Sequence, residues 1–512
     1  MKNTVLRFLS IIISFILIIS VLASCANNEN DKQTIVSVTD TVTNEVEEDV
    51  PVFAEEDYGG REFVILTYDD NATDFIDHYI DSEEHTGEPM NDAVFDRNQM
   101  VEEKYNVQIV QRKCSAGPGI TASRAAKSGT VDFDLIYEWG IRLVPYATEG
   151  MFYDFNQLDY PDLSRSYWAP SAQDDLTIAD KMLISTCDIS MNRIGWAYFL
   201  FFNRSIVEDL NMTLPYDYVD QNNWNLDTFL GMVIGSEQDD GDTIWTNNDQ
   251  YGYLGDSTDA ITWFASCAGI LGTVKNEDGS YTLDVLNDKL ISIYNNYNDK
   301  MATSEAFSTL TIGQWLDGHD ATLKFESPYK NMRFASFGEG HVLFAKFSMD
   351  MTSELIDMED DYGVVPAPKY DSTQQDYFHV IDSCAPMFSI PKQAADLDMV
   401  GVIMEYMAYE SEQRLLPAFY EQTIKTKRMT DMEGRDEAML DLIRDSVHYS
   451  WTSLYYLAME DNKGEPWDPC GSMLSGMLSS GNFSSIAKMY SSAAQYQIDK
   501  LYDTILDLDV NK

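Results

Sequence analysis

Phe133-Asp134-Leu135-Ile136-Tyr137 is a short and almost wholly apolar run, which is the pattern of a strand buried on both faces. Two comparable runs precede it, Phe63-Val64-Ile65-Leu66 and Val107-Gln108-Ile109-Val110. The stretches 90–105 and 121–127 separate the three runs and have a helical pattern. This alternation of strand and helix predicts an α/β fold with a mainly parallel sheet that carries helices on both faces.

The loop that follows Tyr137 is where such a sheet should bind a ligand. In open sheets of parallel strands, ligands bind beyond the carboxyl ends of the strands. Glu138, Trp139 and Arg142 lie in this loop and offer an acid, an aromatic ring and a base. We therefore expect them to contact a ligand, while a Trp139 that only caps its own half of the fold remains the alternative.

The start of the chain has the pattern of a secretory signal peptide. Lys2 and Arg7 are basic, and the apolar run 8–22 ends in Leu22-Ala23-Ser24-Cys25. These four residues resemble the bacterial lipobox, so we predict that residues 1–24 are removed and that Cys25 is diacylated. The alternative is an uncleaved membrane anchor with an incidental cysteine. Either reading places the rest of the chain at the outer face of the cell membrane, tethered and extracellular.

Residues 25–57 form the predicted tether. The segment is rich in Asn, Thr, Asp, Glu and Val, and it lacks sustained periodicity. Like charges at 45–49 favour an extended, solvated chain. Folded sequence is expected to begin at Tyr58-Gly59-Gly60, a turn that leads into the first apolar strand.

Size and charge limit the classes of function. Without the signal peptide, 512 − 24 = 488 residues remain, which is enough for two lobes. The net charge of −51 argues against binding to nucleic acid or to an anionic membrane surface, because both are negatively charged. We attribute the acidity to solubility, and we expect a monomer.

Neither metal nor enzyme motifs are evident. Five cysteines besides Cys25 lack CxxC spacing or a neighbouring histidine, which argues against zinc and favours small buried side chains: Cys114, Cys187, Cys267, Cys384 and Cys470. A bond between Cys187 and Cys384 remains open. Asp239-Asp240-Gly241-Asp242 is interpreted as a solvated loop rather than a cation site, and 274–283 as a hairpin. No GxSxG, Walker A or HExxH motif is present, and we expect no cofactor.

The order of several further segments resembles one known family. The segments that carry the resemblance are Val131-Asp132-Phe133-Asp134-Leu135-Ile136, Gly150-Met151-Phe152-Tyr153-Asp154-Phe155, Lys181-Met182-Leu183-Ile184, Trp196-Ala197-Tyr198-Phe199-Leu200-Phe201-Phe202-Asn203-Arg204, Leu214-Pro215, Asn223-Trp224-Asn225-Leu226-Asp227-Thr228-Phe229, Gln250-Tyr251-Gly252-Tyr253, Glu339-Gly340-His341-Val342-Leu343-Phe344, Asp361-Tyr362-Gly363-Val364-Val365-Pro366-Ala367-Pro368-Lys369 and Ile390-Pro391-Lys392. Together they are similar to the extracellular solute-binding proteins of bacterial ABC importers, in the carbohydrate-binding branch typified by maltose-binding protein. His341 and Phe344 depart from the family pattern.

This resemblance implies a type II periplasmic-binding-protein-like fold, in which two lobes close over a ligand by bending at crossing strands. The implied hinges lie near 190–197 and 378–387. Lobe 1 would comprise 58–193 with 384–425, and lobe 2 would comprise 197–383. Residues 426–512 would form C-terminal helices that pack on one or both lobes.

Candidate ligand residues follow from the chemistry of sugars. Aromatic rings stack on the apolar faces of a sugar, and polar side chains bond its hydroxyls. The candidate aromatic residues are Tyr137, Trp139, Trp263, Trp315 and Trp451, and the candidate polar partners are Asp81, Glu138, Arg142, Asp259 and Asp350. Each aromatic residue could instead belong to the core, and Asp350 could instead cap a helix.

The resemblance implies a lipoprotein that binds a sugar or oligosaccharide and passes it to ABC permease subunits, without chemistry on the ligand. A secreted glycoside hydrolase is the rival from another class, and its two carboxylates can be chosen freely among 85 acidic residues. A surface glycan-binding lipoprotein without a transporter is a third reading. A peptide remains an alternative solute.

Overall fold

The computed structural model describes residues 51–69, 79–255, 257–295, 299–319, 324–325, 327–422 and 434–509. The predicted signal peptide, Cys25 and the tether as far as residue 50 lie outside these ranges. Phe53–Lys512 forms a compact unit of its own. Within the described ranges, no helix combines the length and the apolar character that a membrane span requires.

The folded part begins earlier than the sequence suggests. The ring of Phe53 lies 4.8 Å from that of Tyr406 and 4.9 Å from that of Tyr409, both in the helix α15 (Leu397–Tyr420). Residues 53–57, which we had included in the tether, are therefore held against the fold at this ring. The acidic residues of the segment favour a solvated chain, but Phe53 is aromatic and can bury its ring against the fold.

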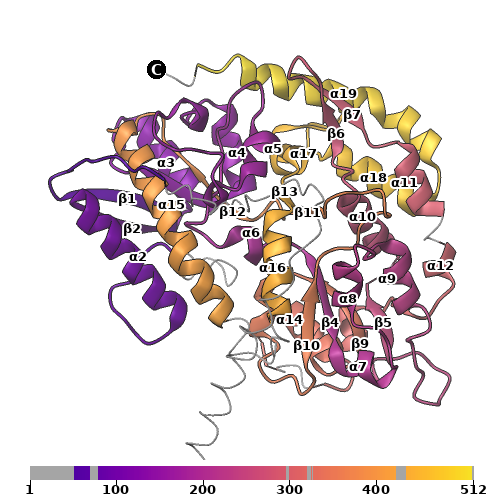
Figure 1. Cartoon of the computed structure of the whole chain (residues 1–512). Coiled ribbons are helices and arrows are strands. Elements are labelled where there is room, and N and C mark those ends of the chain that lie inside the picture. Colours follow the sequence, from indigo (N-terminus) through magenta and orange to yellow (C-terminus); the bar gives the residue numbers. More distant parts are fainter. Residues whose placement is uncertain are drawn as a thin grey trace, which may run out of the picture. The chain divides into compact units, whose positions relative to one another are not determined.

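The first sheet contains the strands that open the sequence argument. Its order is β12-β3-β1-β2, with β1 (Arg61–Tyr68), β2 (Val107–Cys114), β3 (Leu135–Trp139) and β12 (Pro386–Ser389). The predicted strands are confirmed, as are the helices α2 (Pro89–Tyr105) and α3 (Pro118–Ser128) between them. Strand β1 pairs in parallel with both β2 and β3. Helices α2 and α15 lie side by side beside this sheet (Figure 1).

The second sheet has the order β10-β4-β9-β5-β8. Its strands are β4 (Phe199–Asn203), β5 (Tyr251–Leu254), β8 (Phe307–Ser308), β9 (Val342–Phe347) and β10 (Tyr362–Val365). The strands β5, β8 and β9 are parallel, whereas β4 runs antiparallel to both β9 and β10. Two small ladders lie outside the sheets, the predicted hairpin β6 (Gly272–Lys275) with β7 (Tyr281–Asp284), and β11 (His379–Val380) with β13 (Val447–His448).

The antiparallel strands correct the prediction of a mainly parallel sheet. Strand β12 is antiparallel to β3, as β4 is to β9. Between β10 and β12 lies only the short strand β11, so no crossover helix returns the chain to the parallel direction there, whereas α4 (Gly140–Thr148), α5 (Pro170–Leu176) and α6 (Asn192–Gly195) lie between β3 and β4. The alternation of strand and helix therefore accounts for the parallel strands of each sheet. The strands β4 and β12, by which the chain enters one sheet from the other, pair in the antiparallel direction.

Helices surround the two sheets, and many begin at a proline or at a side chain that accepts a backbone N–H, as Asn225 does for α9. The remaining helices are α4 (Gly140–Thr148), α5 (Pro170–Leu176), α6 (Asn192–Gly195), α7 (Arg204–Asp209), α8 (Pro215–Asp220), α9 (Leu226–Val233), α10 (Ser257–Cys267), α11 (Asp288–Ile293), α12 (Asp299–Ala302), α13 (Ile312–Trp315), α14 (Pro328–Arg333), α16 (Arg435–Asp445), α17 (Trp451–Leu454), α18 (Pro469–Ser480) and α19 (Phe483–Leu506). Shorter 3₁₀ and π segments are η1 (Phe155–Gln157), η2 (Ser166–Trp168), η4 (Phe334–Gly338), η5 (Met349–Ser353) and η7 (Tyr455–Ala458).

The C-terminal helices contact helices that follow strands of both sheets. Segments α17 and η7 pack on α4, which follows β3 of the first sheet. Helix α18 packs on α10, which follows β5 of the second sheet. Helix α19 packs on β7, where the side chain of Gln495 accepts the N–H of Leu283 at 2.8 Å and donates to the carbonyl of Tyr281 at 2.8 Å.

Helix α16 is fixed at both ends by buried ion pairs. Near its start, Asp436 accepts hydrogen bonds from Arg204 and Tyr216, and also from the N–H of Val364 in β10 at 3.1 Å. Near its end, Arg444 donates to Asp188 at 2.6 Å. These contacts place the helix beside β10 of the second sheet (Figure 1) and join it to the segment that precedes the first crossing.

Several arginines are buried rather than displayed on the surface. Arg193 pairs with Asp188 at 2.6 Å, Arg333 with Glu354 at 3.4 Å, and Arg204 with Asp436. Arg97 donates to neutral acceptors instead, including the carbonyl of Ile80 at 2.7 Å, and burial lowers its pKa to about 9. Within the described ranges, five arginines are less than 9% exposed: Arg97, Arg193, Arg204, Arg333 and Arg444.

The five described cysteines are all free, and four of them are buried, as the sequence predicts. Cys187 and Cys384 form no bond with each other. Burial raises the pKa of both thiols, to about 11 for Cys384, so both remain protonated at neutral pH.

Asp436→Asn should destabilise the fold strongly, because it keeps the shape of the side chain but leaves Arg204 buried without a counter-charge. We expect the free energy of unfolding to fall by about 3–5 kcal/mol. Asp132→Asn is the control, since Asp132 pairs with Arg112 at the surface, and it should change stability by less than about 1 kcal/mol. Urea denaturation measures both variants, and equal small losses would contradict a structural role for the Asp436 charge.

Candidate functional site

The carboxyl ends of the parallel strands define where a ligand would bind. In the first sheet, β1 and β3 end at Tyr68 and Trp139. The strand β12 begins at Pro386, directly opposite Trp139. In the second sheet, β4 begins at Phe199 opposite Phe347, the last residue of β9. Both crossing strands thus enter their sheets at the carboxyl edge, which is the edge at which α/β sheets bind ligands.

Four side chains gather at the carboxyl edge of the first sheet, and we call them the first cluster: Tyr68, Glu138, Trp139 and Arg142. Glu138 is 2% exposed and accepts hydrogen bonds from the hydroxyl of Tyr68 and from the backbone N–H of Gly119, the latter at 2.7 Å. The same Tyr68 oxygen accepts a hydrogen bond from Arg142 Nη1 at 2.7 Å. A relay of hydrogen bonds thus connects a buried acid to an exposed base.

Trp139 and Arg142 form the accessible part of the first cluster. The Arg142 guanidinium lies 4.3 Å from the centre of the Trp139 ring, while the side chain itself is exposed. Such stacking leaves the edge of the guanidinium free to donate hydrogen bonds. The Nε1 atom of Trp139 is buried and has no hydrogen-bond partner among the described residues. The cluster therefore offers a ring and several N–H donors to a ligand with oxygen acceptors.

Glu138 is a carboxyl group that titrates near neutrality. Burial raises its pKa to about 7, against the opposing effects of the Gly119 N–H and the Arg142 charge. In its protonated form this carboxyl can donate a hydrogen bond, and in its ionised form it only accepts. The hydrogen bonding within the first cluster consequently changes between mildly acidic and mildly alkaline solution.

A second cluster lies at the carboxyl edge of the second sheet and comprises Tyr198, Trp263 and Lys346. The Lys346 ammonium is 5.6 Å from the centre of the Tyr198 ring and 6.0 Å from that of Trp263. A pocket of about 270 Å³ opens beside it at the ends of β5, β8 and β9, with Tyr329 and Ser308 also in its lining. Tyr329 is 43% exposed, which leaves an aromatic surface accessible there.

The second crossing segment connects the two clusters. The carbonyls of Ser383 and Ala385 accept the N–H groups of Ile141 and Gly140, at 3.2 and 3.0 Å, at the start of α4. Asp382, the residue before Ser383, accepts a hydrogen bond from the Tyr198 hydroxyl at 3.3 Å. The first cluster and the second cluster therefore flank the same short stretch of backbone, and together they form the candidate site.

The structure brings together part of the predicted set. Glu138, Trp139 and Arg142 form the first cluster, and Trp263 belongs to the second. Tyr137 is 1% exposed and packs on Phe388 with ring centres 4.8 Å apart, so it lies in the core beneath the site. This position favours the alternative that the ring belongs to the core, and its contact with a ligand stays a prediction.

Other predicted residues lie elsewhere. Trp315 is fully buried against Tyr251 and His341, at the amino ends of β5 and β9, which favours the core alternative. Trp451 is 5% exposed, and its ring lies tilted against that of Tyr281 in the hairpin with centres 4.6 Å apart, which favours the core alternative there as well. Their contact with a ligand stays a prediction.

Of the three predicted aspartates, the structure describes only the side chain of Asp81. Asp81 is exposed and accepts a hydrogen bond from Asn98 in α2 at 3.3 Å, and no contact among the described residues joins it to either cluster. Asp259 belongs to α10 and Asp350 to η5, but their side chains lie outside what the structure describes.

Sequence reasoning missed Tyr68, Tyr198 and Lys346. Tyr68 comes two residues after the predicted strand 63–66, and Lys346 is the last residue but one of β9. The rule that found Trp139, to search where strands end, would have found both. Tyr198 immediately precedes β4, a strand that the sequence predicts without its direction.

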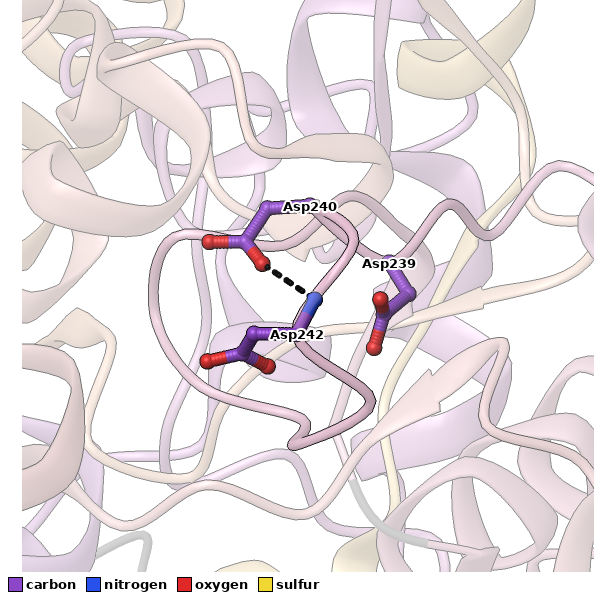
Figure 2. Close-up of side chains that lie close together, drawn as sticks. All are labelled: Asp239, Asp240 and Asp242. Atoms are coloured by element: carbon purple, nitrogen blue, oxygen red, sulfur yellow. Dashed lines mark hydrogen bonds between the residues drawn. The ribbon is translucent and has the colours of Figure 1, made fainter.

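The acidic loop 239–242 forms internal turns. Figure 2 shows the carboxylates of Asp239, Asp240 and Asp242 lying close together, with one hydrogen bond from the N–H of Asp242 to Asp240. Asp239 accepts the N–H groups of Gly241 and Thr243, at 2.7 and 3.1 Å. These carboxylates satisfy the backbone of their own loop, which explains their proximity without a cation.

Glu138→Gln should change how stability depends on pH. The folded-state pKa of Glu138 is about 7 against an ordinary 4.5, so between these values the unfolded chain loses a proton that the folded chain keeps. The free energy of unfolding therefore falls as pH rises through this window, by up to about 3 kcal/mol from this group. Between pH 5 and 7.5, the melting temperature of Glu138→Gln should therefore fall less than that of the unmodified protein. The difference between the two falls should correspond to the free energy that Glu138 contributes. Glu103→Gln, exposed on α2, is the control, and its melting temperature should depend on pH as that of the unmodified protein does. The same pH dependence in all three proteins would refute the raised pKa of Glu138.

No protein-family model and no curated protein sequence matches the chain. Solved structures do match it. The extracellular solute-binding protein from Staphylococcus aureus in complex with maltose is 11% identical, with a TM-score of 0.54 over 86% of this chain and 98% of that one. The cyclic alpha-maltosyl-1,6-maltose binding protein from Arthrobacter globiformis is 12% identical, with a TM-score of 0.51 over 87% and 99%. The sugar transporter RHE_PF00321 from Rhizobium etli, in an open conformation, is 12% identical, with a TM-score of 0.50 over 86% and 99%. The predicted fold class is confirmed, and this chain has the two-lobe, periplasmic-binding-protein-like α/β fold of these proteins.

Proposed function

We propose that this protein captures a sugar, with an oligosaccharide as the preferred form, between its two lobes and delivers it to an ABC importer. The observation that carries the proposal is the first cluster, where Trp139 and Arg142 present a ring and N–H donors at the carboxyl edge of a sheet. Sugars need this combination, because their C–H faces stack on aromatic rings while their hydroxyls accept and donate hydrogen bonds. The sugar-binding proteins that share the fold support the same reading.

We assign lobe 1 to 58–193 with 384–425, lobe 2 to 197–383, and the C-terminal helices to 426–512. Supporting this division, β12 joins the first sheet although it follows the second sheet in the chain. Ligand that touches both clusters would favour the closed form, because it contacts both lobes only there. No chemistry on the ligand is required, so the protein acts as a binding protein rather than an enzyme.

The lipid anchor is the second part of the proposal. The signal sequence and Leu22-Ala23-Ser24-Cys25 support a monomer that is attached to the outer face of the membrane through diacylated Cys25. We expect mass spectrometry of the mature N-terminal peptide to begin at a Cys25 that carries fatty acyl chains. A peptide that begins elsewhere, or an unmodified thiol, would contradict the anchor and leave sugar binding unaffected.

A thermal-shift screen should identify the ligand class. A ligand that binds only the folded state raises the melting temperature, by an amount that grows with its concentration over Kd. We expect oligosaccharides to do so, whereas peptides and polyamines should not. Chromatography should then recover the sugar intact. Cleaved sugar would favour the glycoside hydrolase, and a shift by peptides alone would rule out a carbohydrate ligand.

Trp139→Ala should weaken binding of the best sugar by about 1–3 kcal/mol, because the ring supplies stacking surface and supports the Arg142 guanidinium. Titration calorimetry measures the loss. The matched control is Trp245→Ala, which removes a half-buried tryptophan that packs on Tyr251, at the amino end of β5 and so at the other edge of the sheet from the second cluster. Affinity that is equal in the two variants would remove Trp139 from the site.

A further inference from the structure

Arg142 presents a guanidinium in a fixed orientation at the candidate site. Its central carbon lies 4.3 Å from the centre of the Trp139 ring, and its Nη1 atom donates to the Tyr68 hydroxyl at 2.7 Å. One contact holds the face of the group and the other holds one end, so together they set its plane. The remaining edge, which consists of Nε and Nη2, is without an acceptor among the described residues, and the side chain is exposed.

The charge of Arg142 also has no direct counter-charge in the part of the chain that the structure describes. Other arginines that reach the surface pair with a carboxylate. Arg112, Arg414 and Arg435 do so at 2.7, 2.8 and 2.8 Å. The chain has 85 acidic residues for 34 basic ones, so a guanidinium without a carboxylate is against the general trend. Arg142 therefore keeps its charge available for a group from outside the protein.

The acid of the first cluster, Glu138, does not pair with this guanidinium. Tyr68 lies between the two, because its hydroxyl donates to Glu138 and its oxygen accepts from Arg142. The N–H of Gly119 donates to the other carboxyl oxygen at 2.7 Å. Burial also raises the pKa of Glu138 to about 7, so near neutral pH this carboxyl is only partly ionised and offsets the Arg142 charge incompletely.

Asp382 is the other described acid at the candidate site, and both of its oxygens are engaged. Oδ1 accepts the N–H of Cys384 at 2.7 Å, and Oδ2 accepts the Tyr198 hydroxyl at 3.3 Å. Repulsion between more distant surface carboxylates and an anionic ligand is screened beyond about 8 Å at physiological ionic strength. The net charge of −51 therefore makes a local cation necessary for an acidic ligand, and Arg142 supplies one.

The open edge of the guanidinium matches one kind of chemical group. Two parallel N–H bonds fit the two oxygens of a carboxylate, and the opposite charges strengthen both bonds. A sugar hydroxyl offers one uncharged oxygen and leaves the guanidinium charge uncompensated. A sulfate ester shares the charged oxygens of a carboxylate, but it is tetrahedral where the carboxylate and the guanidinium are both planar. The carboxylate of a uronic acid therefore fits this edge best.

We propose that the candidate site takes an acidic sugar whose carboxylate pairs with the Nε–Nη2 edge of Arg142, and that this residue selects uronate-containing over neutral oligosaccharides. The inference rests on the proposed function and deepens it, because it names the class of sugar.

The test uses the full chain and titration calorimetry with galacturonate and glucuronate oligomers of two to four units. Each oligomer is compared with its carboxyl-reduced counterpart, which keeps the rings and linkages but carries a primary alcohol in place of the charge. We expect the acidic member of the best pair to bind about tenfold to a hundredfold more tightly, since hydrogen bonds to charged groups contribute about that factor. Added salt should weaken the binding of the acidic member only.

Variants of Arg142 assign the preference to this residue. Arg142→Gln keeps an N–H donor without the charge and should make the two members of each pair bind equally. Arg142→Lys returns the charge without the planar fork and should recover part of the preference. The matched control is Arg112→Gln, which should keep the whole preference. Arg112 pairs with Asp132, just before β3 begins and so at the other edge of the sheet. Equal melting temperatures of the variants and the unmodified chain establish that all are folded.

The other outcomes separate this inference from the proposed function. A preference that persists in Arg142→Gln overturns the role of Arg142. Neutral oligosaccharides that bind the unmodified chain as tightly as uronates overturn the acidic class and leave the proposed function intact. Sulfated neutral oligosaccharides form a separate arm, and tight binding of these alone overturns the carboxylate. Failure of every sugar to bind the unmodified chain overturns both the inference and the proposed function.

Discussion

Each crossing strand must satisfy its backbone hydrogen bonds in the sheet that it enters, and this constraint fixes the position of the candidate site. Because β12 pairs with β3 from Pro386 opposite Trp139, the residues just before it have to pass over the start of α4. There the carbonyls of Ser383 and Ala385 accept the free N–H groups of the helix, which would otherwise be left unpaired. The pairing of β4 with β9 brings Tyr198 to the same segment from the other side. Both clusters thus follow from strand pairing.

The buried ion pairs add a second constraint, since they hold α16 against parts of the chain that the crossings connect. Asp436 neutralises Arg204 beside β10, and Asp188 accepts hydrogen bonds from both Arg193 and Arg444. Removal of one partner leaves an uncompensated charge in a poorly solvated place, so such pairs tolerate little displacement. Whatever bending the crossing strands permit has to preserve these contacts.

The sequence predicted the first sheet closely, because its apolar runs are separated by helices and have no competing interpretation. It predicted Glu138, Trp139 and Arg142 for a physical reason, the preference of ligands for strand ends. The sequence did not show that Trp315 and Trp451 are buried, because an aromatic residue type does not reveal which part of the fold covers it. Whether β4 and β12 pair in the parallel or the antiparallel direction depends on the path by which the chain passes from one sheet to the other. The local sequence pattern does not contain this information. Tyr68 and Lys346 were readable in principle, since both stand near the ends of predicted strands.

The buried arginines affect the molecule far from any binding site. The chain has 34 basic residues against 85 acidic ones, and within the described ranges five arginines and nine acidic side chains are buried. Because four of these arginines pair with buried carboxylates, burial removes charges of both signs and the surface keeps the acidic excess that the composition indicates. Two copies that approach each other in dilute electrolyte repel at distances up to about 10 Å or more, until salt shortens that range. Crowded together, these molecules should stay dispersed, because the ion pairs of the interior leave the large net negative charge unchanged.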